Sequence, residues 1–236
     1  MINFLRGFKG LHNLNVNFLL AVILIASAIV RVASNSNFEA EYLTHGDATF
    51  RTILAFDLFE YGFRWEMSGF FMPLYFYLYQ PALYIQQSVK SLIIFQIILS
   101  LIGLYAFYIA TKLRFSKKVA LLSTFLLSIN YYHIILSVTL MSDLVFFLFV
   151  CLCLIFAYRY EEKPNFNNYF LSTSFAAFSG LVRYEGMILF FAVWIVMSFK
   201  YRKILPIFVS LLVYLIPSAL YEYTMYQEKG IFLYGL

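Results

Sequence analysis

The chain has 236 residues, of which 63% are hydrophobic and only 12% are charged, and its mean hydropathy is +0.80. Soluble domains carry roughly a quarter charged residues, so this composition excludes an ordinary soluble protein and predicts an all-α, polytopic membrane protein. The net charge of +5 is typical of basic cytoplasmic loops and does not indicate a nucleic-acid partner. Cys151 and Cys153 are two apart on a predicted helix, so they should point to different sides and serve as buried packing residues.

Seven apolar runs predict seven membrane-spanning helices. They cover residues 18–30, 91–111, 119–135, 144–158, 169–181, 187–199 and 204–221, and some are shorter than the ~20 residues of a full crossing. The first run follows Arg6 and Lys9, as in a signal peptide, but Arg31 comes directly after it and further spans follow, which favours an uncleaved helix. No repeat, linker or soluble domain is evident, so residues 1–236 are expected to form one membrane-embedded domain.

Residues 70–86 are apolar but contain Pro73 and Pro81, so they form either a further span or a helix in the membrane interface. The charges of the loops favour the interface, because eleven of the 17 basic residues then face the cytoplasm. These are Arg6, Lys9, Lys112, Arg114, Lys117, Lys118, Arg159, Lys163, Lys200, Arg202 and Lys203. We therefore predict a cytoplasmic amino terminus, an outer carboxyl terminus, and an outer face that carries ten of the 12 acidic residues.

The first predicted outer loop, residues 34–90, contains a polar stretch at residues 39–66 with six of the 12 acidic residues. Apolar and charged positions within this stretch predict an amphipathic interfacial helix that begins near Asp47 and ends at Gly62. Asp47 either caps this helix or presents a carboxylate to a substrate, and the two interpretations are compatible. We take Asp47 as the first catalytic candidate. His45 lies beside it and is a candidate substrate-binding residue, although a lone loop histidine is more often a bystander.

Asp143 precedes the apolar run at residues 144–158 and is the second catalytic candidate. It either caps the helix or shares a site with Asp47, where it would orient a substrate hydroxyl or hold a divalent cation. Arg183, Tyr184 and Glu185 interrupt another apolar stretch and are candidate substrate-binding residues. Arg183 and Glu185 either form a salt bridge that closes a hairpin or belong to a substrate site, in which the Arg183 guanidinium binds a phosphate.

Motifs of soluble enzymes give no support for another class. The sequence has no zinc-protease, P-loop, nucleophile-elbow or Rossmann motif, and His12 and His133 have no evident partner. The motifs that are present follow a particular order along the chain. They are GDATFRTILAFDLFEYG after the first span, then MPLYFYLY, the basic loop TKLRFSKK, SDLVFFLF at the start of a span, and GLVRYEG between two spans.

This order resembles the membrane-embedded glycosyltransferases of the GT-C fold, especially the protein O-mannosyltransferase and aminoarabinose-transferase-like group. The resemblance covers nearly the whole chain through short motifs. It implies that a sugar is transferred from a polyprenyl-phosphate donor to a lipid, glycan or protein acceptor. Asp47 matches the aspartate that serves as base or orients the acceptor, Asp143 matches an acid that opens a later span, and Arg183 matches a basic residue near the lipid phosphate.

The chain departs from this family in two ways. Many relatives carry an Asp-Glu pair where this chain has Asp47-Ala48, so a mechanism with two adjacent carboxylates would require Glu39, Glu41 or Asp57 as the second. Members of the family are also usually longer. The chain is therefore expected to be a fragment, a minimal version, or half of a site that a partner completes.

The combined prediction is an inverting glycosyltransferase of the membrane, with its active site on the outer face. One alternative is a transporter or lipid flippase, although transporters usually place charges near the bilayer midplane on broken helices and often show internal symmetry. Another is a non-catalytic subunit. A transferase requires Asp47, Asp143 and Arg183 to share one cavity, whereas dispersed positions favour the non-catalytic interpretation.

Overall fold

The computed structural model describes residues 15–37, 46–61, 73–201, 208, 211–216, 219 and 223. Over these residues the chain consists of α-helices and short turns without a strand, which confirms the predicted all-α class. The helices are α2 (Val16–Asn37), α3 (Gly46–Tyr61), α4 (Pro73–Ile85), α5 (Val89–Arg114), α6 (Lys117–Ser128), α7 (Tyr131–Val138), α8 (Asp143–Glu162), α9 (Phe166–Gly180) and α10 (Glu185–Tyr201).

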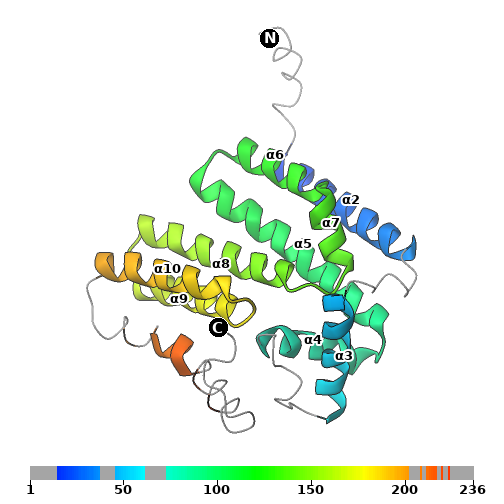
Figure 1. Cartoon of the computed structure of the whole chain (residues 1–236). Coiled ribbons are helices and arrows are strands. Elements are labelled where there is room, and N and C mark those ends of the chain that lie inside the picture. Colours follow the sequence, from blue (N-terminus) through cyan, green and yellow to red (C-terminus); the bar gives the residue numbers. More distant parts are fainter. Residues whose placement is uncertain are drawn as a thin grey trace.

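The helices form a bundle around α5 and α8, which pack side by side (Figure 1). On one side of this pair α9 packs on α8 and α10 packs on α9, and on the other side α2 and α6 pack on α5. The short helices α3 and α4 lie together at one end of the bundle, near the start of α8 (Figure 1). That end also receives the turn between α9 and α10, so three loop regions distant in sequence meet there.

Three of the described helices, α2, α5 and α8, are long and apolar enough to cross a membrane. The bent pair α6 and α7 is a fourth candidate if it counts as one span, and α10 is a shorter apolar helix. Several membrane-spanning helices are therefore present, as predicted. The count of seven stays a prediction, since the last run, at residues 204–221, lies largely outside the described residues.

The span predicted at residues 119–135 is not a single helix, because the chain breaks there into α6 and α7 with a bend of 61°. The break follows from Asn130, whose side-chain oxygen accepts a hydrogen bond from the His133 backbone N–H at 3.1 Å and so caps a new helix. The run was predicted as one helix because nearly all of its residues are apolar. Asn130 was the residue that indicated the break, since asparagine is a preferred N-cap residue and interrupts a helix more readily than its apolar neighbours do.

A buried arginine holds the broken span against α2. Arg31 is 0% exposed, and its Nη1 donates to the Ser27 carbonyl at 3.1 Å, to the Ser27 hydroxyl, and to the Ser128 carbonyl at 3.4 Å. Its Nη2 lies 2.6 Å from Nδ1 of His133, which is the partner that the sequence did not reveal. Carbonyl groups at the end of a helix lack intrahelical donors, so Arg31 stabilises the end of α6 as well as the bend.

The helix predicted after the first apolar run begins and ends close to its predicted limits, since α3 runs from Gly46 to Tyr61. Its charged positions do not all face outward, however, because Arg51 is only 8% exposed. The following α4 has 13 residues, about 20 Å of helix, which is less than the ~30 Å hydrocarbon core of a membrane. Gln80 ties it to α3 by donating to the Ala55 carbonyl at 3.3 Å.

The two cysteines are free and buried, as their spacing predicts. Cys151 belongs to the main apolar cluster, which also contains residues of α4 and α5, whereas Cys153 belongs to a second cluster with residues of α9 and α10. The Cys153 sulfur lies 3.5 Å from the Ser172 hydroxyl of α9. Opposite sides of α8 therefore pack against different helices, which makes α8 the central element of the bundle.

Two glycines bring α9 and α10 close together at their connecting turn. A Cβ atom at Gly186 would overlap the backbone of Ser179 and Gly180, and one at Gly180 would lie 3.3 Å from the Gly186 carbonyl carbon. The backbones therefore approach in a way that no side chain permits. The residues between these glycines, including Arg183, are held in a tight turn as a result.

We expect Gly186→Ala to lower the free energy of unfolding by about 1–3 kcal/mol, because the new methyl group must push two backbones apart. Thermal unfolding in detergent measures the effect. The matched control is Gly46→Ala, since a Cβ atom there meets nothing within 4 Å. If the two variants unfold at the same temperature, the close approach of α9 and α10 is contradicted.

Candidate functional site

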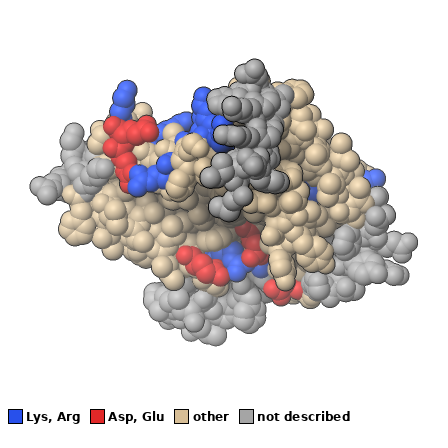
Figure 2. Space-filling model, turned by 90° about the horizontal axis from the view of Figure 1, so that it is seen from above, with Lys and Arg blue, Asp and Glu red and all other residues tan. Residues whose placement is uncertain are grey.

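A cavity of about 920 Å³ opens where the three loop regions meet. Its walls come from the start of α3, from the turn between α7 and α8, and from the turn between α9 and α10. The lining residues are Gly46, Asp47, Phe50, Arg51, Met141, Ser142, Asp143, Val182, Arg183, Tyr184 and Glu185. Figure 2 shows acidic and basic side chains gathered in a hollow, apart from a second charged group at the upper edge of the same face.

The first wall comes from α3, where Asp47 is exposed and lies in the first turn. A negative charge at this position interacts favourably with the helix dipole. Arg51 lies four residues later, hence on the same face of the helix. Its guanidinium is 5.3 Å from the centroid of the Tyr75 ring. Burial lowers the pKa of Arg51, and the charges of Asp47 and Asp143 partly offset this shift. Arg51 was missed as a site residue, although its spacing from Asp47 is visible in the sequence.

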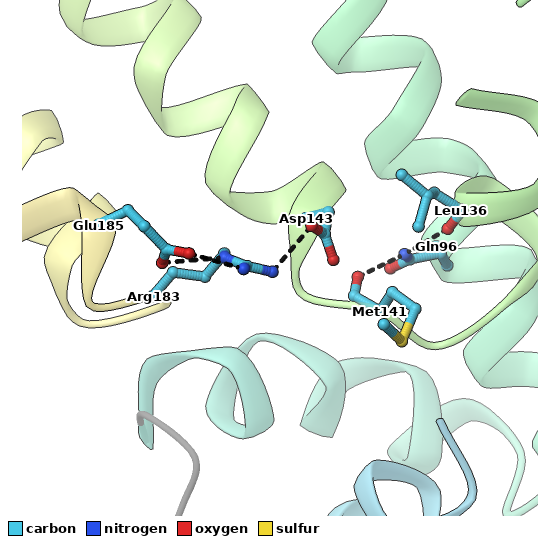
Figure 3. Close-up of polar contacts among 6 residues, drawn as sticks. All are labelled: Gln96, Leu136, Met141, Asp143, Arg183 and Glu185. Atoms are coloured by element: carbon cyan, nitrogen blue, oxygen red, sulfur yellow. Dashed lines mark hydrogen bonds and ion pairs between the residues drawn. The ribbon is translucent and has the colours of Figure 1, made fainter. Parts of the chain in front are cut away.

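The second wall places Asp143 at the first position of α8. The N-cap position belongs to Ser142, so the interpretation of Asp143 as the helix cap is wrong. Its carboxylate instead faces the α9–α10 turn, where its Oδ1 accepts a hydrogen bond from Nη1 of Arg183 at 2.8 Å (Figure 3). The hydroxyl of Ser142 is buried and makes no hydrogen bond within the described part of the chain. The start of α8 therefore supplies a carboxylate to the cavity, with a buried hydroxyl beside it.

The third wall contains the predicted salt bridge between Arg183 and Glu185. Arg183 donates from Nε to Oε2 of Glu185 at 3.2 Å and from Nη2 to Oε1 at 2.8 Å, which is a two-bond fork (Figure 3). These bonds raise the pKa of Arg183 and lower the pKa of Glu185. Together with the bond to Asp143, they fix the plane of the guanidinium and join two turns 40 residues apart in sequence.

The backbone of this turn is also anchored. The Leu74 N–H, in the first turn of α4, donates to the Leu181 carbonyl at 3.2 Å. N–H groups in the first turn of a helix have no partner within that helix, so this bond gives the Leu74 N–H an acceptor and connects α4 to the α9–α10 turn. Within the turn, the Arg183 N–H donates to the Ser179 carbonyl at 2.9 Å. Arg183 is thus held through its backbone and its side chain.

Most of the predicted site residues meet in the cavity: Asp47, Asp143, Arg183, Tyr184 and Glu185 all line it. His45 lies outside the described residues, as do Glu39 and Glu41. Asp57 does not line the cavity, and Ala48 is buried, so Arg51 is the ionic neighbour of Asp47 in this wall. The described residues contain no group of three or more histidine, cysteine or acidic side chains arranged to hold a metal ion.

The arrangement combines two guanidinium groups with three carboxylates. Guanidinium groups bind phosphate through paired N–H donors, and carboxylates accept protons from hydroxyl groups. A comparison with protein families matches residues 72–222, more than half of the chain, to the dolichyl-phosphate-mannose-protein mannosyltransferases. The chain belongs to this family. It is accordingly a membrane glycosyltransferase of the GT-C type, in agreement with the motifs and the apolar helices.

The family match includes the second and third walls of the cavity, with Asp143, Arg183 and Glu185, and begins after the wall that carries Asp47. Comparisons with curated proteins and with solved structures give no match. The geometry of the cavity is therefore the observation that links Asp47 to the other site residues of this mannosyltransferase-like chain.

The fork between Arg183 and Glu185 predicts a small loss of stability in acid. The pKa of Glu185 is lowered from 4.5 in the folded protein, so the pair stabilises the fold above pH 4.5 and this contribution is lost as the pH falls through the lowered pKa. The loss should stay below about 1 kcal/mol, because the Glu185 side chain is 58% exposed. Between about pH 6 and pH 3, the melting temperature should fall less in Glu185→Gln than in the wild type. Equal falls would contradict this role of the fork.

Proposed function

We propose that the chain transfers a sugar, mannose being the family precedent, from a polyprenyl-phosphate donor to an acceptor hydroxyl bound in the cavity. The observation that carries the proposal is the convergence of Asp47, Asp143 and Arg183 on one cavity from three distant segments. Such a site brings phosphate-binding and proton-accepting groups within reach of one substrate pair. Holding two reactants in this way lowers the entropic cost of reaction.

Arg183 is the proposed ligand of the donor phosphate. Its three hydrogen bonds to Glu185 and Asp143 leave one N–H on each terminal nitrogen, so a phosphate oxygen can bind without breaking the fork. Arg51 contributes a second positive charge to the same cavity. As the bond between the anomeric carbon and the phosphate oxygen breaks, these cations stabilise the negative charge that remains on the lipid phosphate.

Asp47 is the proposed base. The acceptor oxygen attacks the anomeric carbon, the phosphate leaves with the bonding electrons, and the acceptor proton passes to the exposed Asp47 carboxylate. Asp143 is engaged by Arg183 through Oδ1, which leaves Oδ2 to orient the acceptor hydroxyl. A divalent cation, where the reaction uses one, would bind through a cavity carboxylate together with the donor phosphate. Lipids, glycans and proteins all remain candidate acceptors.

The distribution of charge along α8 supports an outer position for the cavity. Asp143 lies at one end of the helix, and Arg159 and Glu161 lie at the other, where Glu161 is 3.6 Å from Arg114 of α5. The second end also carries the basic residues between α5 and α6. Basic loops prefer the cytoplasm, so the cavity is proposed to face outward and the amino terminus inward.

Asp47→Asn should lower transfer of labelled sugar from a polyprenyl-phosphate donor by about a hundred- to ten-thousand-fold, because the amide has the shape of the carboxylate but cannot accept the proton. The assay uses membranes that contain equal amounts of each protein. Asp57→Asn is the matched control, because it makes the same chemical change on the same helix outside the cavity. Equal transfer by Asp47→Asn and the wild type would exclude Asp47 from the mechanism.

The product should have the opposite anomeric configuration to the donor, because a single direct displacement with one base inverts the carbon centre. NMR coupling constants of the anomeric proton in the purified product distinguish the two configurations. Retention would contradict direct displacement from the opposite face, because it requires either two successive displacements through a bond to a protein group or attack on the face from which the phosphate leaves.

A further inference from the structure

Gln96 is a buried polar residue near the start of the spanning helix α5. Its side chain is 0% exposed, and leucine and isoleucine surround it in the sequence of the helix. A primary amide in an apolar, membrane-spanning helix has a high desolvation cost unless its donors are satisfied. We therefore expect the Gln96 amide to have hydrogen-bond partners that offset its desolvation. Gln96 does not line the cavity, so these partners must lie elsewhere in the bundle.

The partners are three backbone carbonyls on the chain that leads into the site. Gln96 Nε2 lies 3.0 Å from the Leu136 oxygen, 3.2 Å from the Thr139 oxygen and 2.9 Å from the Met141 oxygen. Carbonyl oxygens only accept hydrogen bonds, so the amide nitrogen must be the end that faces them. Figure 3 shows the contacts to Leu136 and Met141 beside Asp143.

Two of these carbonyls lie at the end of a helix, since Leu136 is in the last turn of α7 and Thr139 is its C-cap residue, and the third, of Met141, lies two residues before Asp143. The Thr139 carbonyl also accepts a hydrogen bond from the Met141 N–H at 2.8 Å. Carbonyls at the end of a helix need donors from elsewhere, and the two N–H groups of the Gln96 amide are shared among the three carbonyls. The Gln96 amide therefore fixes the path of the α7–α8 turn against a rigid helix, and this turn positions the first residue of α8.

We propose that Gln96 is a positioning residue for the transfer reaction, acting through Asp143. This role rests on the proposed function of the cavity. The Arg183 guanidinium meets Asp143 at 2.8 Å, so a shift of the turn would alter both the carboxylate and the cation that it contacts. Displacement of a reacting group by about 1 Å can cost on the order of a hundredfold in rate.

Gln96→Met tests this role, because methionine has a similar length and no donor. We expect amide hydrogen exchange at residues 139–143 to become faster and kcat to fall about ten- to a hundredfold. The matched control is Ser172→Ala, which removes another buried bond between helices, from the Ser172 hydroxyl to the Cys153 carbonyl at 3.1 Å. The control should leave both exchange at residues 139–143 and kcat unchanged.

A double-mutant cycle with Asp143→Asn separates positioning from general destabilisation. If Gln96 acts through Asp143, Gln96→Met should cost much less activity in the Asp143→Asn background than in the wild type. Gln96→Glu adds a second readout. An ionised carboxylate repels the three carbonyls, whereas its protonated form donates one hydrogen bond, so its activity relative to the wild type should rise as the pH falls.

The results separate the two proposals. Faster exchange at residues 139–143 together with a non-additive loss of activity supports the positioning role. Unchanged exchange, or equal losses in both backgrounds, overturns it. If the wild type transfers no sugar from any polyprenyl-phosphate donor, the proposed function fails, while the exchange measurement still decides whether Gln96 holds the turn.

Discussion

The ionic link between Arg183, Glu185 and Asp143 is the interaction on which the site depends. Glu185, in the same turn, accepts two hydrogen bonds from the Arg183 guanidinium and so orients it. Asp143, at the start of α8, accepts a third bond, from Nη1 of Arg183 to its Oδ1 at 2.8 Å. Neither carboxylate alone would fix both the plane of the guanidinium and the distance between the turns. The link thus joins two parts of the bundle and leaves one N–H on each terminal nitrogen of Arg183, so that a structural role and the proposed phosphate-binding role fall on one side chain.

The surrounding fold allows polar groups to be held in an apolar bundle. Gly180 and Gly186 permit the close turn that carries Arg183, and Gln96 satisfies the carbonyls of the turn that carries Asp143. At the other break in the bundle, Arg31 performs the corresponding task for the end of α6. Where Arg31 and Gln96 act, the chain interrupts its helical hydrogen bonding and a side chain from a neighbouring helix supplies donors to the carbonyls, since water is scarce in this environment.

Much of this structure was predictable from the sequence, for reasons specific to particular residues. Long apolar runs predicted α2, α5 and α8, and the unusual charges at Asp47, Asp143 and Arg183 marked three segments of the cavity. The break at Asn130 was hidden, because the hydropathy of residues 119–135 stays high across it. The roles of Arg31 and Gln96 could not be predicted, because their contacts are distant in sequence and depend on how the helices pack, whereas the spacing of Arg51 from Asp47 on one face of α3 was visible in the sequence.

An experimental structure with a polyprenyl-phosphate sugar donor bound is the most direct test of the proposed site. We expect the donor phosphate to lie within hydrogen-bond distance of Arg183, with the anomeric carbon facing the side of the cavity that carries Asp47. The lipid chain should leave the cavity along the apolar surface of the bundle. A donor bound in another part of the molecule, with its phosphate out of reach of Arg183, would contradict the proposed role of Arg183 and of the cavity.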